Sequence, residues 1–156
     1  VSLLDALIEA AQTPAVREEV VTAPAGSALR DTLEAPWKHM RTAIEHLRQD
    51  ETDEALHAAR IRAKRVRYGA EAVAPVFGKR ARAFAKAAEA LQDVLGEHQD
   101  AVVASAWLRE AVKASSAQSF VAGQLFAFEA EAGRAARAAW PDAWKAFSRK
   151  KLRFWS

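Results

Sequence analysis

Apolar side chains recur every three or four positions along most of the 156-residue chain, which is the spacing of one face of an α-helix. No segment shows the strict two-residue alternation that predicts a half-buried β-strand. The stripes, with the prolines and capping residues between them, predict helices over residues 3–11, 14–21, 36–49, 53–74, 79–113, 115–139 and 141–152. We therefore predict an all-α fold, an antiparallel helical bundle.

Each long helix carries one apolar stripe that predicts its buried face. The predicted core residues are Trp37, Met40, Ile44, Leu47, Ala59, Val66, Ala70, Val73, Phe84, Ala88, Leu91, Leu95, Val102, Phe120, Val121, Leu125 and Phe128. Four aromatic residues near the C-terminus, Trp144, Phe147, Phe154 and Trp155, are expected to dock on the bundle. His98 lies at the edge of its stripe and is interpreted as a core histidine with satisfied hydrogen bonds.

Three prolines are expected to bound helices, because proline lacks a backbone N–H and disfavours helical geometry in the residue before it. Pro36 is expected to separate its helix from a preceding segment that Ser27 caps. Pro75 is expected to end one helix, and Pro141 to open the last one. Each proline therefore predicts a boundary in the chain.

The turn at 75–78 is short, so the helices before and after it are predicted to be antiparallel neighbours. Counting outward along both helices from this turn places Arg60 near Asp93 and Lys64 near Glu89. The same counting places Arg67 level with Lys86. Ion pairs across the seam, the line of contact between these two helices, would neutralise part of the positive charge.

Charge is distributed along the chain in blocks. Residues 57–86 contain nine cations and one anion, Glu71, whereas the whole chain carries a net charge of only +3. Residues 1–56 and 87–133 are acidic, and residues 134–156 are basic again, with seven cations and one anion. Charge concentrated in this way creates a local field that a polyanionic partner would meet.

The first basic block falls on two helix faces. At about 100° per residue, His57, Arg60, Lys64 and Arg67 form one stripe of the 53–74 helix. The second set stands at the start of the next helix: Lys79, Arg80, Arg82 and Lys86. Cations at a helix N-terminus oppose the helix dipole, which predicts an external anion held there by backbone N–H groups and side chains together. The alternative is a basic face that is only solvated and partly ion-paired.

Several kinds of chemistry lack their residues in this sequence. There are no cysteines, which excludes disulfides and thiolate metal sites. We find no glycine-rich phosphate loop and no nucleophile–base pair, and His39 and His46 share a helix face without a third ligand. Four carboxylates line one helix face and are interpreted as solvated or ion-paired: Glu89, Asp93, Glu97 and Asp100. No apolar run reaches the length of a membrane span, although the basic, aromatic segment 144–155 leaves a membrane-surface role open.

Two runs of sequence resemble a known family. The first is HAARIRAKRVRY, from His57 to Tyr68, and the second is LQDVLGEHQD, from Leu91 to Asp100. Together they resemble the two signature blocks of the CHAD family, the conserved histidine α-helical domain, and their spacing across Pro75 also fits. The resemblance implies helical-bundle repeats that each open with a histidine–arginine helix. It assigns residues 53–156 to a four-helix repeat and residues 1–50 to the tail of a preceding repeat.

The resemblance implies non-enzymatic binding of inorganic polyphosphate, with no catalytic residue, metal or cofactor, and a cytoplasmic location, associated with polyphosphate granules. It carries over His57, Arg60, Lys64, Arg65 and Arg67 as binding residues. The helix-start cations Lys79, Arg80, Arg82 and Lys86 are added from the charge pattern and the family's general basic character. A row of cations along a polyphosphate would release many counterions, as happens along nucleic acids.

Two other functions compete with this interpretation. The first is nucleic-acid binding, although Tyr68 is the only aromatic residue of the basic helix and a base-stacking platform is not apparent. The second is a metal-dependent phosphohydrolase that would use His57 with nearby carboxylates, for which the sequence shows no convincing ligand set.

Overall fold

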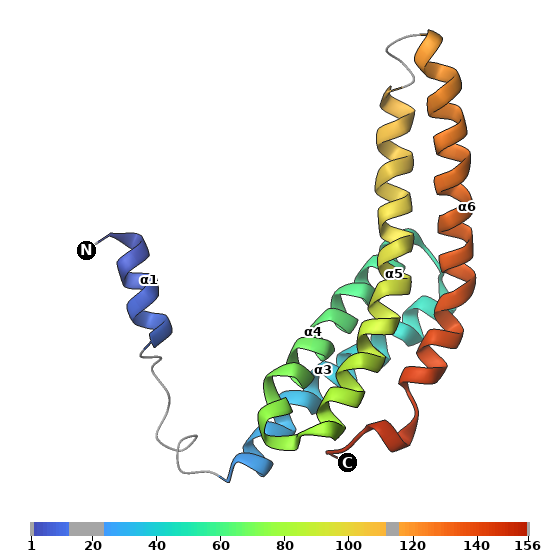
Figure 1. Ribbon diagram of the computed structural model, residues 1–156. Helices are drawn as coiled ribbons and strands as arrows, with labels where there is room; N and C mark the ends of the chain where they lie inside the picture. Colours follow the sequence, from blue (N-terminus) through green and yellow to red (C-terminus); the bar gives the residue numbers. More distant parts are fainter. Residues whose placement is uncertain (1, 13–23, 112–115, 156) are drawn as a thin grey trace.

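The computed structural model describes residues 2–12, 24–111 and 116–155, and within them every regular element is a helix. The elements are α1 (Leu3–Gln12), α3 (Ala25–Gln49), α4 (Asp53–Phe77), α5 (Lys79–Ala111), α6 (Ser116–Phe147) and the short 3-10 helix η2 (Lys150–Leu152) (Figure 1). The predicted all-α fold is confirmed. The predicted helix over 14–21 lies outside the described residues.

The long helices pack in chain order, α3 against α4, α4 against α5, and α5 against α6 (Figure 1). Their neighbouring parts enclose one core. The C-terminal half of α5 and the N-terminal half of α6 continue beyond the ends of α3 and α4 as a two-helix arm (Figure 1). The segment after α6 turns back along the end of the bundle, where η2 lies against α5.

The three prolines do not bound helices as predicted. Pro36, Pro75 and Pro141 lie inside α3, α4 and α6 respectively. Pro75 and Pro141 are exposed and Pro36 is half-buried, and each proline leaves the carbonyl four residues before it without a helical N–H partner. Buried residues stand before and after Pro36 and Pro141, and Pro75 lies between the buried Val73 and the half-buried Phe77. This packing holds each helix on course, because tertiary packing outweighs a local propensity.

The end of α4 is set by Gly78 instead of Pro75. Gly78 has a φ of 61° and a ψ of −132°, a backbone region that favours glycine strongly, and its N–H donates to the Ala74 carbonyl at 2.9 Å. The next helix, α5, begins at the following residue, as predicted. No loop of any length therefore separates the two helices.

This turn corrects the predicted register of α4 against α5. Since α4 is three residues longer than expected, each residue meets a partner about one turn further along α5. His57 bonds Gln99, Arg60 lies beside Gly96, and Arg67 bonds Glu89. The predicted partners of Arg60 and Lys64, namely Asp93 and Glu89, and the predicted level of Arg67 with Lys86, were wrong for this reason.

The predicted core of the bundle is largely confirmed. Its buried residues include Trp37, Met40, Ile44, Leu47, Ala59, Val66, Ala70, Val73, Phe84, Ala88, Leu91 and Leu95, whereas Val102 is half-buried. The C-terminal aromatics dock as expected: Trp144, Phe147 and Trp155 are buried, and Phe154 packs on Phe77. Their rings meet Trp37 and Phe84 in one aromatic cluster, which joins α3, α5, α6 and the C-terminal segment.

Four residues of α6 were wrongly assigned to the core. Phe120, Val121, Leu125 and Phe128 are exposed, with Phe120 at 73% and Phe128 at 70%. They belong to the N-terminal half of α6, which runs along the arm, and among the described helices α5 is the one that packs against α6 there (Figure 1). The face of α6 that meets α5 carries small residues instead: a Cβ at Gly133 would stand only 3.2 Å from the Ala101 Cβ.

The N-terminal helix α1 begins as predicted. Ser2 Oγ accepts from the Asp5 backbone N–H at 3.2 Å, and Asp5 accepts from the Ser2 N–H at 3.0 Å, which is the reciprocal pattern of a capping box. None of its residues is buried. The bundle that carries the basic face is therefore built by α3 to α6.

Replacement of Gly78 by alanine tests the turn. A Cβ at Gly78 would meet nothing within 4 Å, so the cost of Gly78→Ala comes from the backbone alone, about 1–3 kcal/mol of unfolding free energy. Gly123 lies inside α6 with equally open space, so Gly123→Ala is expected to stabilise by about 0.5–1 kcal/mol. Urea unfolding measures the free energy of unfolding of both variants. A change of the same sign in both would contradict the assignment of Gly78 as the positive-φ glycine that ends α4.

Candidate anion-binding face

The basic stripe of α4 lies along its seam with α5. Thr52 caps the helix by accepting the Ala55 N–H at 3.2 Å, and acidic residues occupy the first turn, where the helix dipole favours them. The buried face of α4 is made of alanine, leucine and valine. Because Leu56, Ala59 and Val66 take the inner side, the cations between them are turned toward the seam and the solvent.

His57 and Arg60 sit at the part of the seam nearest the start of α4. His57 Nδ1 and Gln99 Oε1 form a hydrogen bond of 2.7 Å, which orients the exposed imidazole across the two helices. Arg60 is half-buried over Gly96, where a Cβ would stand 3.6 Å from its Nε. That Nε is buried and has no hydrogen-bond partner among the described residues. A buried donor without an acceptor is costly, and an anion at the seam would supply one.

Arg67 occupies the middle of the seam and is already ion-paired. Its guanidinium lies 3.5 Å from Glu71 of α4 and 3.2 Å from Glu89 of α5. The expected absorption of cations by ion pairs therefore holds for Arg67. Lys64 is exposed and stands over the ring of Tyr68, with its ammonium 5.6 Å from the ring centroid. The Arg65 side chain is also exposed, one residue further round the helix.

The second set of cations surrounds the turn between the helices. Lys79, Arg80, Arg82 and Lys86 are all exposed on the first two turns of α5, since Ala81, Phe84, Ala85 and Ala88 take the inner side. Within the described ranges, Arg67 is the one member of the nine candidates for which an ion pair is recorded. The predicted residues thus form two groups of cations, one near His57 and one near Gly78, with the ion-paired Arg67 between them.

The carboxylates of α5 do not form a metal centre in the part of the chain that the structure describes. Glu89 is taken by Arg67, and Asp93, Glu97 and Asp100 are exposed. His39 and His46 are exposed on α3. In the same residues, no helix is both long and apolar enough to cross a membrane.

A polar cluster joins α6 to the start of α4. Arg137 binds the Asp53 carboxylate and donates to the Glu51 carbonyl oxygen at 2.6 Å, while Trp140 Nε1 donates to Glu51 Oε1 at 3.1 Å. His98 is buried beside them, with its Nε2 3.3 Å from both Asp53 Oδ1 and Arg137 Nη2. The interpretation of His98 as a core histidine is confirmed for its burial and for its Nε2. Its Nδ1 has no partner among the described residues.

The pKa of His98 is lowered from its ordinary value near 6.5. Burial is the largest cause, because it penalises the charged imidazolium, and the neighbouring guanidinium of Arg137 acts in the same direction. The Asp53 and Glu51 carboxylates oppose the shift. His98 is therefore a neutral element of the cluster at pH 7.

Sequence reasoning missed the partners that orient the seam. No role was predicted for Gln99, and although Gly96 is a natural mark of a close helix contact, its partner Arg60 follows only from the true register. Residues that meet across the seam are symmetrical about Gly78, as His57 is with Gln99 and Arg60 with Gly96. If Gly78 had been chosen as the centre of the turn instead of Pro75, the sequence would have predicted that residues equidistant from Gly78 meet across the seam.

These observations define an all-α bundle with a basic face on two successive helices. A comparison with protein families matches the CHAD domain over residues 1–109, and the chain therefore belongs to the CHAD domain family. Two curated relatives, "Uncharacterized protein MT2285" and "Uncharacterized protein Rv2226" of Mycobacterium tuberculosis, are each 34% identical over 131 residues. The match covers 82% of this chain and 24% of either relative, so the chain spans about a quarter of their length. No solved structure matches.

The buried His98 predicts a pH dependence of stability. Since its pKa is lower in the folded state, the unfolded chain binds a proton first as the pH falls through about 6.5, and the folded state loses stability until its own pKa is reached. The loss is bounded at about 1.4 kcal/mol per pH unit. We expect the melting temperature to fall between pH 7 and pH 5, and to fall less in His98→Gln.

The exposed His46 supplies the control for this experiment. His46→Gln removes an imidazole of the same kind without disturbing the cluster, so its melting curve should follow the parent protein from pH 7 to pH 5. If the two variants show the same pH dependence, the burial of His98 is not its source.

Proposed function

We propose that this protein binds inorganic polyphosphate, without catalysis, along the basic face of α4 and the first turns of α5. The observation that carries the proposal is the concentration of nine cations in residues 57–86, of which only Arg67 has a recorded ion pair within the described ranges. Membership of the CHAD family, with the resemblance of the two signature runs, supports it. Like charges at helical spacing repel, and a polyanion would turn that repulsion into attraction.

The binding residues proposed are His57, Arg60, Lys64, Arg65, Arg67, Lys79, Arg80, Arg82 and Lys86. From His57 to Arg67 the stripe would run for about 15 Å along α4, so it suits an extended ligand better than a single phosphate. Arginine presents a planar fork of donors to phosphate oxygens, and Arg60 lies half-buried on the seam without a recorded carboxylate partner among the described residues. His57, oriented by Gln99, would add a further donor at the same end.

The ion pairs of Arg67 shape this proposal. Glu89 places a negative charge on the seam, so a polyanion would contact the groups near His57 and near Gly78 more closely than the middle. Arg67 would act mainly by offsetting Glu71 and Glu89. The assignment of residues 53–156 to one repeat, and of residues 1–50 to the tail of another, remains a prediction.

A charge reversal tests the site. In Arg60→Glu with Lys64→Glu, affinity for long-chain polyphosphate should fall by at least tenfold, and the slope of log affinity against log salt should fall by about 1.5, because two counterion-releasing contacts are lost. Arg149→Glu with Lys150→Glu changes the charge equally at two exposed residues outside the face, and its affinity for polyphosphate should fall much less. Lys64→Arg keeps the charge and should bind nearly normally.

Filter binding at matched ionic strength measures all of these variants. Equal losses from the two reversed pairs would mean diffuse electrostatics and would falsify the site. Competition by single-stranded and duplex DNA in the same assay separates the proposal from nucleic-acid binding. A protein that prefers DNA at the same concentration of phosphate would be a nucleic-acid binder instead.

Polyphosphate should also stabilise the fold. A ligand that binds only the folded state stabilises it by about 2.7 kcal/mol at a concentration a hundred times its dissociation constant. Thermal unfolding at low salt should therefore show a raised melting temperature, and the rise should shrink as salt screens the charges. An unchanged melting temperature at low salt with excess polyphosphate would count against binding.

A further inference from the structure

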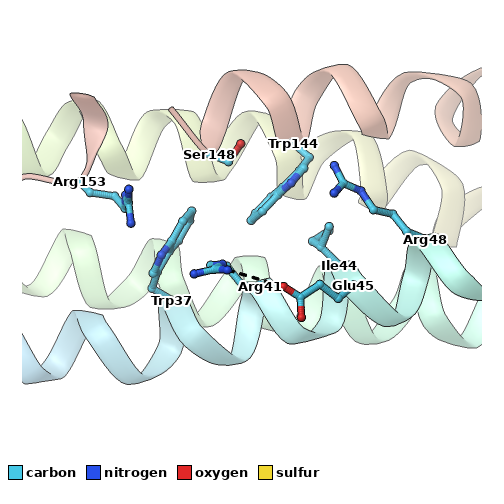
Figure 2. Close-up of a pocket in the computed structure, with 8 residues that line it drawn as sticks. All are labelled: Trp37, Arg41, Ile44, Glu45, Arg48, Trp144, Ser148 and Arg153. Atoms are coloured by element: carbon cyan, nitrogen blue, oxygen red, sulfur yellow. Dashed lines mark ion pairs between the residues drawn. The ribbon is translucent and has the colours of Figure 1, made fainter. Parts of the chain in front are cut away.

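A second basic surface lies between α3 and the C-terminal part of the chain. A cavity of about 350 Å³ opens there, lined on the α3 side by Trp37, Arg41 and Arg48. Trp144 at the end of α6 and Arg153 after η2 close the other side. In Figure 2 the side chains of Arg41 and Arg153 stand near the Trp37 end of this space, and Arg48 stands at the Trp144 end.

The charge of this cavity is positive. Three guanidinium groups line it against one carboxylate, that of Glu45. Glu45 lies 3.7 Å from Arg41 in an exposed pair along one helix, and such pairs contribute little. Arg41 and Arg48 belong to the same helix, whereas Arg153 lies more than a hundred residues further along the chain, so its place at this cavity depends on the docking of the C-terminal aromatics.

The wall of the cavity is held rigidly by the aromatic cluster. The Trp37 ring stacks on Trp144 with centroids 5.6 Å apart and an interplanar angle of 19°, and the Arg153 guanidinium lies 5.8 Å from the Trp37 centroid. Trp37 is only 5% exposed, yet its indole Nε1 has no hydrogen-bond partner among the described residues. A buried N–H donor without an acceptor costs about 1–3 kcal/mol. The Trp37 ring forms part of the cavity wall, so a ligand bound there would change the surroundings of this indole group.

We infer that this cavity binds a compact phosphate anion of two or three negative charges, of the size of a diphosphate. Three arginines against one glutamate leave a net charge that such an anion matches, and guanidinium forks fit phosphate oxygens in pairs. The volume is at the lower end of the range for small-ligand sites. Both tryptophans are more than nine-tenths buried, so no open ring face is offered to a stacked base.

This site is separate from the polyphosphate face proposed above. Its residues lie on α3, the end of α6 and the C-terminal segment, whereas the other face lies on α4 and α5. The two proposals therefore fail independently. Binding here also differs in kind, because a cavity of limited volume suits a short anion and an extended helix face suits a long one.

The test titrates ¹⁵N-labelled protein with pyrophosphate and follows the Trp37 indole N–H resonance, assigned by its loss in Trp37→Phe. We expect a saturable shift of this resonance. In Arg41→Gln with Arg48→Gln the affinity read from it should fall by at least about tenfold, since two charge-assisted contacts are removed. Both side chains are exposed, so the fold should be unaffected.

Three further variants sharpen the test. Arg109→Gln with Arg134→Gln removes the same charge from exposed positions of the arm and should leave the affinity unchanged. Glu45→Gln removes the opposing carboxylate and should tighten binding by about threefold, a gain that damage to the fold would not produce.

The double variant Arg60→Gln with Lys64→Gln alters the polyphosphate face and should preserve the Trp37 shift. A Trp37 resonance that does not move at saturating pyrophosphate, or equal losses from the cavity pair and the arm pair, would overturn the inference. Adenosine diphosphate should bind no more tightly than pyrophosphate, and a tenfold preference for the nucleotide would overturn the assignment to a simple phosphate anion.

Discussion

The basic face depends on the turn at Gly78. A single glycine with positive φ ends α4 and lets α5 begin at the next residue, so the two helices are related like the arms of a hairpin with no loop. Residues equidistant from Gly78 therefore meet across the seam. This rule decides that His57 meets Gln99, that Arg60 meets a glycine, and that Arg67 meets Glu89. A shift of one helical turn would have given each cation a different partner.

The register also separates the cations that are ion-paired within the protein from those that are left available to a ligand. Arg67 is half-buried between two carboxylates, and removing it would leave those charges without compensation. Arg60 faces the opposite situation, because Gly96 makes room for its guanidinium and offers it no acceptor. Cations that are placed by packing and left without carboxylate partners are suited to binding. A count of basic residues in the sequence cannot make this distinction, since both arginines lie on the same predicted stripe.

The sequence predicted the buried face of a helix well where other helices cover the whole apolar stripe. Trp37, Met40, Ile44 and Leu47 all proved buried, because every side of that stripe is covered. The prediction of burial failed where it depends on whether another helix packs against the stripe. The aromatic residues of α6 such as Phe120 and Phe128 have helical spacing, but in the described part of the chain no third helix covers the arm. The prolines misled for a related reason, since packing on both sides carried the helices through them. The cavity at Trp37 was also beyond prediction, because Arg48 and Arg153 line one cavity only in the folded chain.

The two proposed anion sites should act independently, and the reason lies in the core between them. The aromatic cluster of Trp37, Phe84, Trp144 and Phe147 fills the space between the α3 side and the α5 side of the bundle. Packed rings of this kind have few voids into which a side chain could shift, so the cluster holds one arrangement. Direct electrostatic coupling is also weak, because exposed charges further apart than about 8–10 Å are largely screened at physiological salt. Occupation of one site should therefore change the affinity of the other only through net charge, which salt removes. Coupling that survived high salt would require a change in the aromatic cluster itself, and the Trp37 ring, which belongs to both the cluster and the cavity wall, is where such a change would begin.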